Sequence, residues 1–190
     1  MAIVLASQSP RRQELLARIG VEDFKTLSLD IDESYPEGLS PEDTVRYIAK
    51  KKCDAAAALC SPDDLIITAD TMVFLGNDRL GKPRDEEDAL RMLCALSGRA
   101  HTVCTGVSVR RGAQEERFAV STRVFFRPMT DDEIRAYIKT GEPMDKAGAY
   151  GVQSRGALFV ERIDGDFFNV MGLPVEQLGL VLARFGVKLL

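Results

Sequence analysis

Two arginines stand in the first turn of a predicted helix, where their charge is out of place. Ser9 and Pro10 give a helix start, and Arg11 and Arg12 follow directly. Because the N-terminal end of a helix already carries partial positive charge and unpaired N–H groups, two cations there favour an anion as partner. Helix N–H groups and guanidinium groups together make a phosphate site. The alternative is that both side chains extend into water, as surface arginines commonly do.

A lysine falls on the apolar face of a second predicted helix, which starts at Ser40 and runs to about residue 59. Lys52 has the same spacing of three and four as the apolar residues of that face. These residues are Val45, Ile48, Ala49, Ala56 and Leu59. An inward lysine either extends its ammonium group to water or meets a negative partner, and both interpretations stay open.

A carboxylate interrupts the apolar strand predicted over residues 65–75. Asp70 lies in the middle of that run, where burial is costly unless the carboxylate binds a cation or a hydrogen-bond donor. It could be a structural partner of Lys52 or of an arginine, or it could be functional. Glu33, after the second predicted strand, offers another carboxylate. Two such oxygen ligands suit a magnesium or manganese ion bound together with substrate phosphates, which indicates metal-assisted chemistry on a phosphate ester.

Composition and missing motifs exclude several classes of function. The chain has 190 residues and a net charge of -4, which disfavours a nucleic-acid partner bound through a general basic surface. His101 is the single histidine, expected to be a structural hydrogen-bonder, and none of the four cysteines forms a C-x-x-C pair, so a zinc site lacks ligands. Neither a P-loop nor a dinucleotide-binding motif occurs. No apolar run reaches the roughly 20 residues of a membrane span, and no signal-peptide pattern occurs, so we expect a cytoplasmic protein without a membrane partner.

The predicted elements that position these residues alternate between helices and strands. Strands are expected at residues 3–6, 24–29, 65–75, 102–109 and 117–126, and helices at 9–20, 40–59, 85–98, 130–141 and 174–186. Residues 158–163 and 167–170 are expected to form a hairpin around Asp164 and Gly165. No linker separates independent domains. The pattern predicts an α/β fold with a mixed sheet.

Several segments of the chain resemble those of the Maf family of nucleoside triphosphate pyrophosphatases. The opening LASQSPRR, residues 5–12, is similar to the signature of that family. The resemblance continues in register over nearly the whole chain. Further matching segments are Asp32-Glu33, Lys52, residues 69–71, 81–84, 96–98, 145–153 and 170–174.

This resemblance implies a fold and an activity. Maf proteins are similar in fold to inosine triphosphatases, with an elongated mixed β-sheet flanked by helices and two lobes around a central cleft. We therefore expect one Maf-like domain over residues 1–190. The family hydrolyses a nucleoside triphosphate to the monophosphate and pyrophosphate with a divalent metal, Mg²⁺ or Mn²⁺. Its members are cytoplasmic and often homodimers.

The resemblance also implies a role for individual residues. Asp70 would be the general base and, with Glu33, would bind the metal. The phosphates would be held by Ser7, Arg12, Lys52 and Lys82.

Three further positions separate two subfamilies. Arg11, Thr71 and Gln153 match the dTTP/UTP pyrophosphatases, whereas the subfamily acting on 7-methyl-GTP tends to have Trp, Gln and Glu there. Two alternatives remain: a purine-selective pyrophosphatase, and a nucleotide-sensing regulator of septation that binds without turnover.

Overall fold

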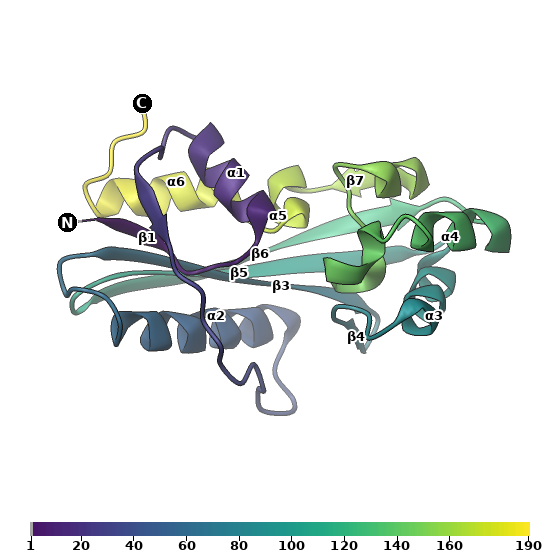
Figure 1. Ribbon diagram of the computed structural model, residues 1–190, viewed down its shortest axis with the longest axis horizontal. Helices are drawn as coiled ribbons and strands as arrows, with labels where there is room; N and C mark the ends of the chain where they lie inside the picture. Colours follow the sequence, from purple (N-terminus) through teal and green to yellow (C-terminus); the bar gives the residue numbers. More distant parts are fainter. Residues whose placement is uncertain (1) are drawn as a thin grey trace. The chain divides into compact units, whose positions relative to one another are not determined.

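The computed structural model describes residues 2–190, and the chain divides into two compact units. The first unit comprises residues up to 70, 105–120 and 172–190, and the second comprises 71–104 and 121–171. Figure 1 gives the element labels. The expected single domain over residues 1–190 stays a prediction.

A mixed sheet of seven strands supplies the framework, with the order β2-β1-β3-β5-β6-β7 and β4 paired to β3. The strands are β1 (Ile3–Leu5), β2 (Phe24–Thr26), β3 (Leu65–Leu75), β4 (Asp78–Leu80), β5 (Ala100–Arg111), β6 (Gln114–Phe126) and β7 (Val160–Asp164). β1 runs parallel to both β2 and β3, whereas β4 and β7 are antiparallel to their neighbours β3 and β6. The long strands β3, β5 and β6 each contribute residues to both units. The predicted α/β class with a mixed sheet flanked by helices is confirmed.

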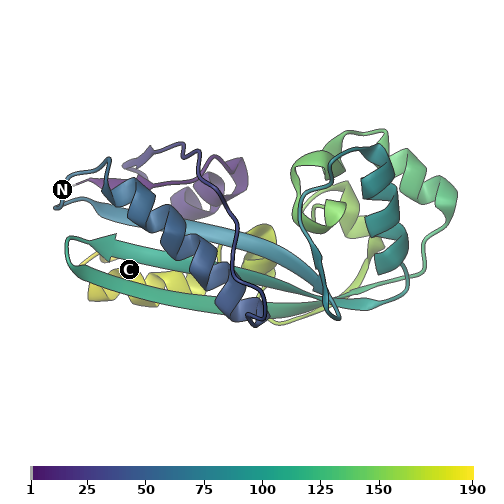
Figure 2. The same cartoon turned by 90° about the horizontal axis from the view of Figure 1, so that it is seen from below.

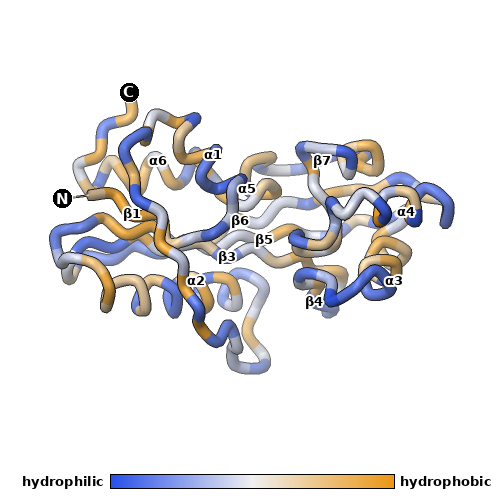
Figure 3. Tube along the Cα trace, in the orientation of Figure 1, coloured by the Kyte–Doolittle hydropathy of each residue, from blue (hydrophilic) through white to orange (hydrophobic). Residues whose placement is uncertain are grey.

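In the first unit, helices cover both faces of the sheet. α1 (Pro10–Arg18) and α6 (Val175–Arg184) lie on one face, and α2 (Pro41–Ala57) lies on the other (Figure 1). α2 packs directly on β5, because a Cβ atom on Gly106 would lie 2.4 Å from the backbone of Val45. Figure 3 shows the apolar trace of β1, which turns hydrophilic where the chain enters α1. This hydrophilic entry is the segment in which the sequence predicts phosphate binding.

The second unit contains α3 (Glu86–Leu96), α4 (Asp131–Ile138) and α5 (Phe167–Met171) with three short 3₁₀ helices. These are η1 (Glu142–Asp145), η2 (Ala147–Ala149) and η3 (Arg155–Phe159). α3 packs beside α4 (Figure 2). The capping box predicted for α4 is present, since Thr130 Oγ1 accepts from the N–H of Glu133 and Glu133 Oε2 accepts from the N–H of Thr130.

Two local predictions are wrong. The expected strand over 167–170 is the helix α5, because Asp166 Oδ1 accepts from the N–H of Phe168 at 2.7 Å and starts a helical turn. β7 therefore pairs with β6 and does not form a hairpin with residues 167–170. The predicted inward position of Leu59 is also wrong, since α2 ends at Ala57 and 68% of Leu59 is exposed. None of the helices within residues 2–190 has the length and apolar character needed to cross a membrane.

Candidate active site

Lys52 joins the two carboxylates that the sequence singled out. Its Nζ lies 2.8 Å from Asp70 Oδ1 and 3.0 Å from Glu33 Oε1. Asp70 is 7% exposed, so its carboxylate is buried against this cation. Of the two interpretations of Lys52, the one with a negative partner is confirmed, and the two predicted metal-site carboxylates meet at one ammonium group.

The packing of α2 on β3 brings these groups together. Residues on the inward face of α2, including Ala49 and Cys53, are fully buried. Thr68 Oγ1 donates a 2.7 Å hydrogen bond to the carbonyl of Ala49, which fixes the register of strand on helix. Because side chains on a strand alternate, Thr68 and Asp70 share one face of β3, and Lys52 lies one helical turn after the Ala49–Thr68 contact. The apolar helix face thus sets the position of the ion pair.

Arg12 is anchored by hydrogen bonds to the protein. Its Nη1 donates to Ser7 Oγ at 3.1 Å and to the carbonyl of Ala69 at 2.9 Å, and its Nε donates to the carbonyl of Gly172 at 2.8 Å. The interpretation that the Arg12 side chain extends into water is therefore wrong. The contact with Ala69 holds the guanidinium group beside the residue that precedes Asp70.

The charges around Arg12 define the electrostatics of this region. Burial lowers the pKa of the Arg12 guanidinium below its ordinary value. The charge of Asp70 opposes this shift, Arg11 lowers the pKa further and Glu33 raises it. An arginine remains protonated under these influences. Arg11, Arg12, Asp70 and Glu33 therefore interact electrostatically, and the region combines cations with carboxylates.

The start of α1 adds backbone donors to this region. Ser9 is the N-cap residue and Pro10 opens the helix, as predicted, although the Ser9 side chain makes no capping hydrogen bond. Instead Ser7 Oγ accepts from the N–H of Ser9 at 3.3 Å as well as from Arg12. The first turn of α1 contains no acidic residue. The partial positive charge of the helix end is thus added to that of the two arginines.

The residues present are compatible with a divalent metal that is shared with a substrate. No group of three or more His, Cys, Asp or Glu side chains suited to a metal occurs within residues 2–190. Glu33 and Asp70 each approach the same Lys52 Nζ, so the two carboxylates lie near each other. Mg²⁺ commonly uses one or two carboxylates and completes its shell with water and phosphate oxygens. A metal here would need water and substrate oxygens to complete its coordination.

In the second unit, three predicted residues lie on segments that contact one another. Thr71 is on β3, Lys82 follows β4, and Gln153 follows η2. The N–H of Gly148 donates to the carbonyl of Gly81, next to Lys82, at 3.1 Å. A Cβ atom on Gly148 would lie 2.9 Å from Val73 Cγ2, and Gly148 has a φ of +69°, so glycine is required for this close approach to β3. Lys82 and Gln153 are both exposed.

Sequence reasoning missed the groups that hold the Gln153 segment. Glu142, at the start of η1, accepts a hydrogen bond from Tyr137 Oη at 2.7 Å and one from Ser154 Oγ at 2.6 Å. The sequence offers no periodicity or motif that singles out Glu142. The structural role expected for His101 is confirmed, since its Nε2 lies 2.8 Å from Tyr150 Oη within a buried aromatic cluster.

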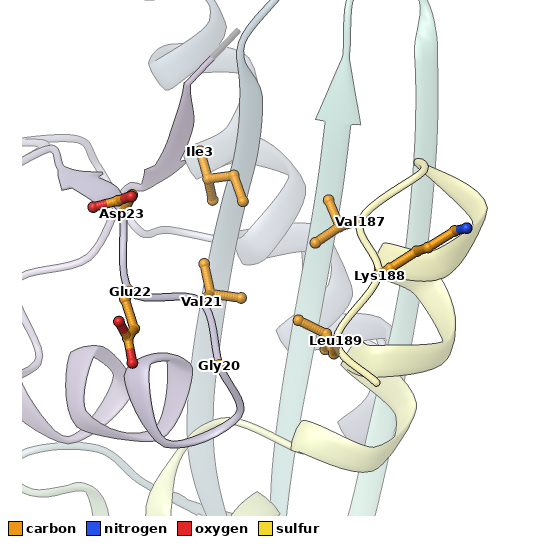
Figure 4. Close-up of a pocket in the computed structure, with 8 residues that line it drawn as sticks. All are labelled: Ile3, Gly20, Val21, Glu22, Asp23, Val187, Lys188 and Leu189. Atoms are coloured by element: carbon orange, nitrogen blue, oxygen red, sulfur yellow. The ribbon is translucent and has the colours of Figure 1, made fainter.

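A hollow of about 300 Å³ lies elsewhere in the first unit, between the turn after α1 and the C-terminal tail (Figure 4). Ile3, Val21, Val187 and Leu189 give it apolar walls, and the Lys188 ammonium group points away from them in Figure 4. None of the predicted site residues lines this hollow.

Comparison with known proteins identifies relatives over nearly the whole chain. The dTTP/UTP pyrophosphatase of Moorella thermoacetica is 51% identical over 188 residues, covering 97% of this chain and 95% of the relative. The dTTP/UTP pyrophosphatase of Bacillus velezensis is 46% identical over 186 residues, covering 98% of this chain and 97% of the relative. Among solved structures, the Ham1 protein of Staphylococcus aureus has a TM-score of 0.55 at 14% identity, covering 97% of this chain and 100% of that one. A HAM1 protein from Coxiella burnetii has a TM-score of 0.53 at 13% identity, covering 97% of this chain and 99% of that one.

The two kinds of similarity support different conclusions. The solved structures share the mixed α/β fold with this chain at low sequence identity, so they bear on the fold alone. The family model described as Maf-like protein matches residues 2–185. With relatives near half identity over almost their full lengths, the chain belongs to the Maf family.

Proposed function

We propose that this chain is a nucleoside triphosphate pyrophosphatase that hydrolyses dTTP and UTP to the monophosphate and pyrophosphate. The observation that carries the proposal is the cluster of Arg12, Lys52, Asp70 and Glu33, where anchored cations meet carboxylates beside a helix N-terminus. The names of the relatives agree with it, since they are dTTP/UTP pyrophosphatases.

Asp70 acts as the general base in this proposal. A carboxylate accepts the proton of a water molecule as that water attacks the α-phosphorus. The new phosphorus–oxygen bond forms while the bond from the α-phosphorus to the bridging oxygen breaks, so pyrophosphate leaves. Lys52 holds Oδ1 of Asp70 and thereby fixes the orientation of the carboxylate. General-base catalysis of this kind typically contributes about a hundred- to ten-thousand-fold in rate.

Arg12, Lys52, Ser7 and Lys82 hold the triphosphate. Arg12 is fixed by Ser7, Ala69 and Gly172 before any ligand arrives, so little side-chain entropy remains to be lost on binding. Cations held in this way stabilise the negative charge that builds up on the leaving pyrophosphate. Lys82, which is exposed on the loop after β4, contributes a further positive charge.

Asp70 and Glu33 would hold a Mg²⁺ or Mn²⁺ ion together with phosphate oxygens. Such an ion, when bound, neutralises phosphate charge and orients the triphosphate. Lys52 lies between the same two carboxylates, so it limits their mutual repulsion whether or not the ion is present.

Gln153 reads the pyrimidine base. The uracil and thymine edge offers both an acceptor and a donor, and a glutamine amide complements both, whereas an ionised glutamate only accepts. Gln153 is exposed beside the buried Val152, so its amide is accessible to a ligand. Arg11 and Thr71 shape the remainder of the base and sugar contacts.

A pyrophosphate-release assay with dTTP, UTP, CTP, GTP and ATP, each with Mg²⁺ or Mn²⁺, tests the proposal. We expect the highest kcat/KM with dTTP and UTP, and loss of turnover on removal of the metal with a chelator. Faster release from GTP or ATP would favour a purine-selective enzyme. Tight nucleotide binding without pyrophosphate release would favour a regulator that does not turn over.

The cellular setting in this proposal follows the family resemblance. The enzyme is a cytoplasmic homodimer whose partner is its nucleotide substrate, with no nucleic acid or membrane partner. The net charge of -4 agrees with the absence of a nucleic-acid partner. Sedimentation equilibrium of the purified protein measures the oligomeric state, and a monomer at micromolar concentration contradicts the dimer.

A further inference from the structure

The carboxylate of Glu142 is the centre of a hydrogen-bond network in the second unit. Oε1 accepts from Tyr137 Oη at 2.7 Å, from Ser154 Oγ at 2.6 Å and from the N–H of Gly156 at 3.3 Å. Oε2 accepts from the N–H of Arg155 at 3.4 Å. A single side chain at the start of η1 therefore fixes three consecutive residues that follow Gln153.

Tyr137 extends this network to the other side of Gln153. Its Oη donates to Glu142 and accepts from the N–H of Gly151 at 3.0 Å. Tyr137 is 4% exposed, and its ring packs edge-on against Phe159 with centroids 5.1 Å apart. Because the ring is held by packing, its hydroxyl is a fixed anchor. Gln153 thus lies on a span of two residues between the anchored positions 151 and 154.

Close packing leaves this segment little freedom. A Cβ atom on Gly156 would lie 2.6 Å from the carbonyl oxygen of Gly151 and 2.8 Å from Tyr137 Oη. Ala149 has a φ of +60°. No other non-glycine residue that the structure describes has a positive φ. A buried alanine in the left-handed region costs free energy and persists only where its surroundings impose it.

The charge state of Glu142 agrees with its role as an acceptor. Burial acts to raise the pKa of this carboxyl, but the hydrogen bonds from Ser154, Tyr137 and the backbone outweigh it, so the pKa lies below its ordinary 4.5. The carboxylate is therefore ionised at neutral pH. Hydrogen bonds to an ionised acceptor are stronger than those between neutral groups.

We propose that Glu142 and Tyr137 are positioning residues for base selectivity, which hold the backbone around Gln153 so that its amide meets the uracil or thymine edge. This inference rests on the proposed function, in which Gln153 reads the base. Neither residue touches the substrate. Their effect appears as discrimination between bases and not as a general loss of hydrolysis, because Asp70 and three of the four proposed phosphate-binding residues, Ser7, Arg12 and Lys52, belong to the first unit.

The test measures kcat and KM for UTP, CTP and GTP in the purified enzyme. Tyr137→Phe removes one hydroxyl and both of its hydrogen bonds, and we expect the UTP to CTP ratio of kcat/KM to fall about three- to tenfold. Glu142→Ala removes all four contacts and should lower that ratio by about tenfold or more. Glu142→Gln keeps an acceptor oxygen and should restore most of the selectivity. The kcat for GTP should stay within about twofold of the unmodified enzyme in all three variants.

Two matched variants serve as controls. Tyr47→Phe changes an exposed tyrosine on α2, and Glu161→Ala removes an exposed carboxylate on β7. Both should keep the UTP to CTP ratio of the unmodified enzyme. If Glu142→Ala does not fold, Tyr137→Phe carries the test, since it deletes a single oxygen atom.

Two failures can be told apart. An unmodified enzyme that releases pyrophosphate from no nucleotide contradicts the proposed function. If the unmodified enzyme prefers UTP, and Tyr137→Phe and Glu142→Ala keep the same UTP to CTP ratio of kcat/KM, only the positioning role is contradicted. Equal losses with UTP, CTP and GTP would also overturn it, because they would show that the network supports the fold as a whole.

Discussion

Ion pairs join Lys52, Asp70 and Glu33 in the first unit, whereas the Gln153 segment of the second unit is held by hydroxyl and backbone donors that meet at one carboxylate. In the first unit, Lys52 joins Asp70 to Glu33, and Arg12 interacts electrostatically with both carboxylates. In the second, Glu142 collects two hydroxyl and two backbone donors. Charges suit a triphosphate, which is recognised by electrostatics, while a neutral base is recognised by shape and by directed hydrogen bonds. The two regions are thus built for different parts of one substrate in the proposed function.

The largest effect is expected from a change to the Asp70 carboxylate in the first region. Asp70→Asn keeps the shape of the side chain but removes the proton acceptor, so we expect kcat to fall about a hundred- to ten-thousand-fold while nucleotide binding survives. Pyrophosphate release and equilibrium binding are measured in parallel. Asp63→Asn, an exposed change in the turn before β3, is the matched control. Near-normal turnover of Asp70→Asn would make Asp70 structural and the assigned mechanism wrong.

Removal of Arg12 tests whether the first region acts through phosphate charge. Arg12→Ala deletes a fixed guanidinium, and loss of one charge-assisted contact of about 1.5–3 kcal/mol weakens triphosphate binding by roughly 10- to 150-fold. Binding of the free nucleoside should change much less. Titration calorimetry with UTP and uridine gives both values. Equal weakening for both ligands would mean that Arg12 acts through its bonds to Ser7, Ala69 and Gly172 in support of the fold.

A change in the second region should alter base choice and spare phosphate chemistry. Gln153→Glu replaces a donor and acceptor by an acceptor alone, so kcat/KM for dTTP and UTP should fall about ten- to a hundredfold. Activity on GTP should fall less or rise, because a carboxylate accepts from the N1–H and 2-amino groups of guanine. Steady-state kinetics with dTTP, UTP and GTP measure the pattern. Parallel losses on pyrimidine and guanine substrates would show that Gln153 does not read the base.

The same contrast explains which parts of the molecule could be predicted from the sequence. Asp70 and Lys52 were detectable because a charge within an apolar pattern is costly unless it is paired, and the structure pairs them. Glu142 follows a glycine in a polar segment, where the sequence indicates no free-energy penalty for a carboxylate. Its role can therefore be recognised only from the contacts that it makes in the folded loop. The helix α5 was missed because the aromatic residues Phe167 and Phe168 favour a strand, while the cap formed by Asp166 decided otherwise.

The last expected effect concerns the pH dependence of stability, which should arise in the second region. His101 is 3% exposed in the aromatic cluster of the second unit, and burial lowers its pKa from the ordinary 6.5 to about 4. A base with a lowered pKa binds its proton more readily when the chain is unfolded, so its contribution to stability is complete above pH 6.5 and is lost as the pH falls towards 4. By linkage the loss is about 2 kcal/mol at pH 5 and about 3 kcal/mol below pH 4.

Urea unfolding between pH 7.5 and 5 measures this loss, and a single variant assigns it. His101 is the chain's only histidine, so the ordinary pKa values of the other side chains lie outside most of that interval. His101→Gln can still form a hydrogen bond to Tyr150 Oη but does not titrate, and its stability should therefore change little between pH 7.5 and 5. The free energy of unfolding of the unmodified protein should exceed that of the variant most at pH 7.5. This difference should be about 2 kcal/mol smaller at pH 5. A difference that stays constant with pH would show that His101 is protonated equally in the folded and unfolded chain. The second region would then tolerate a buried charge as the first one does.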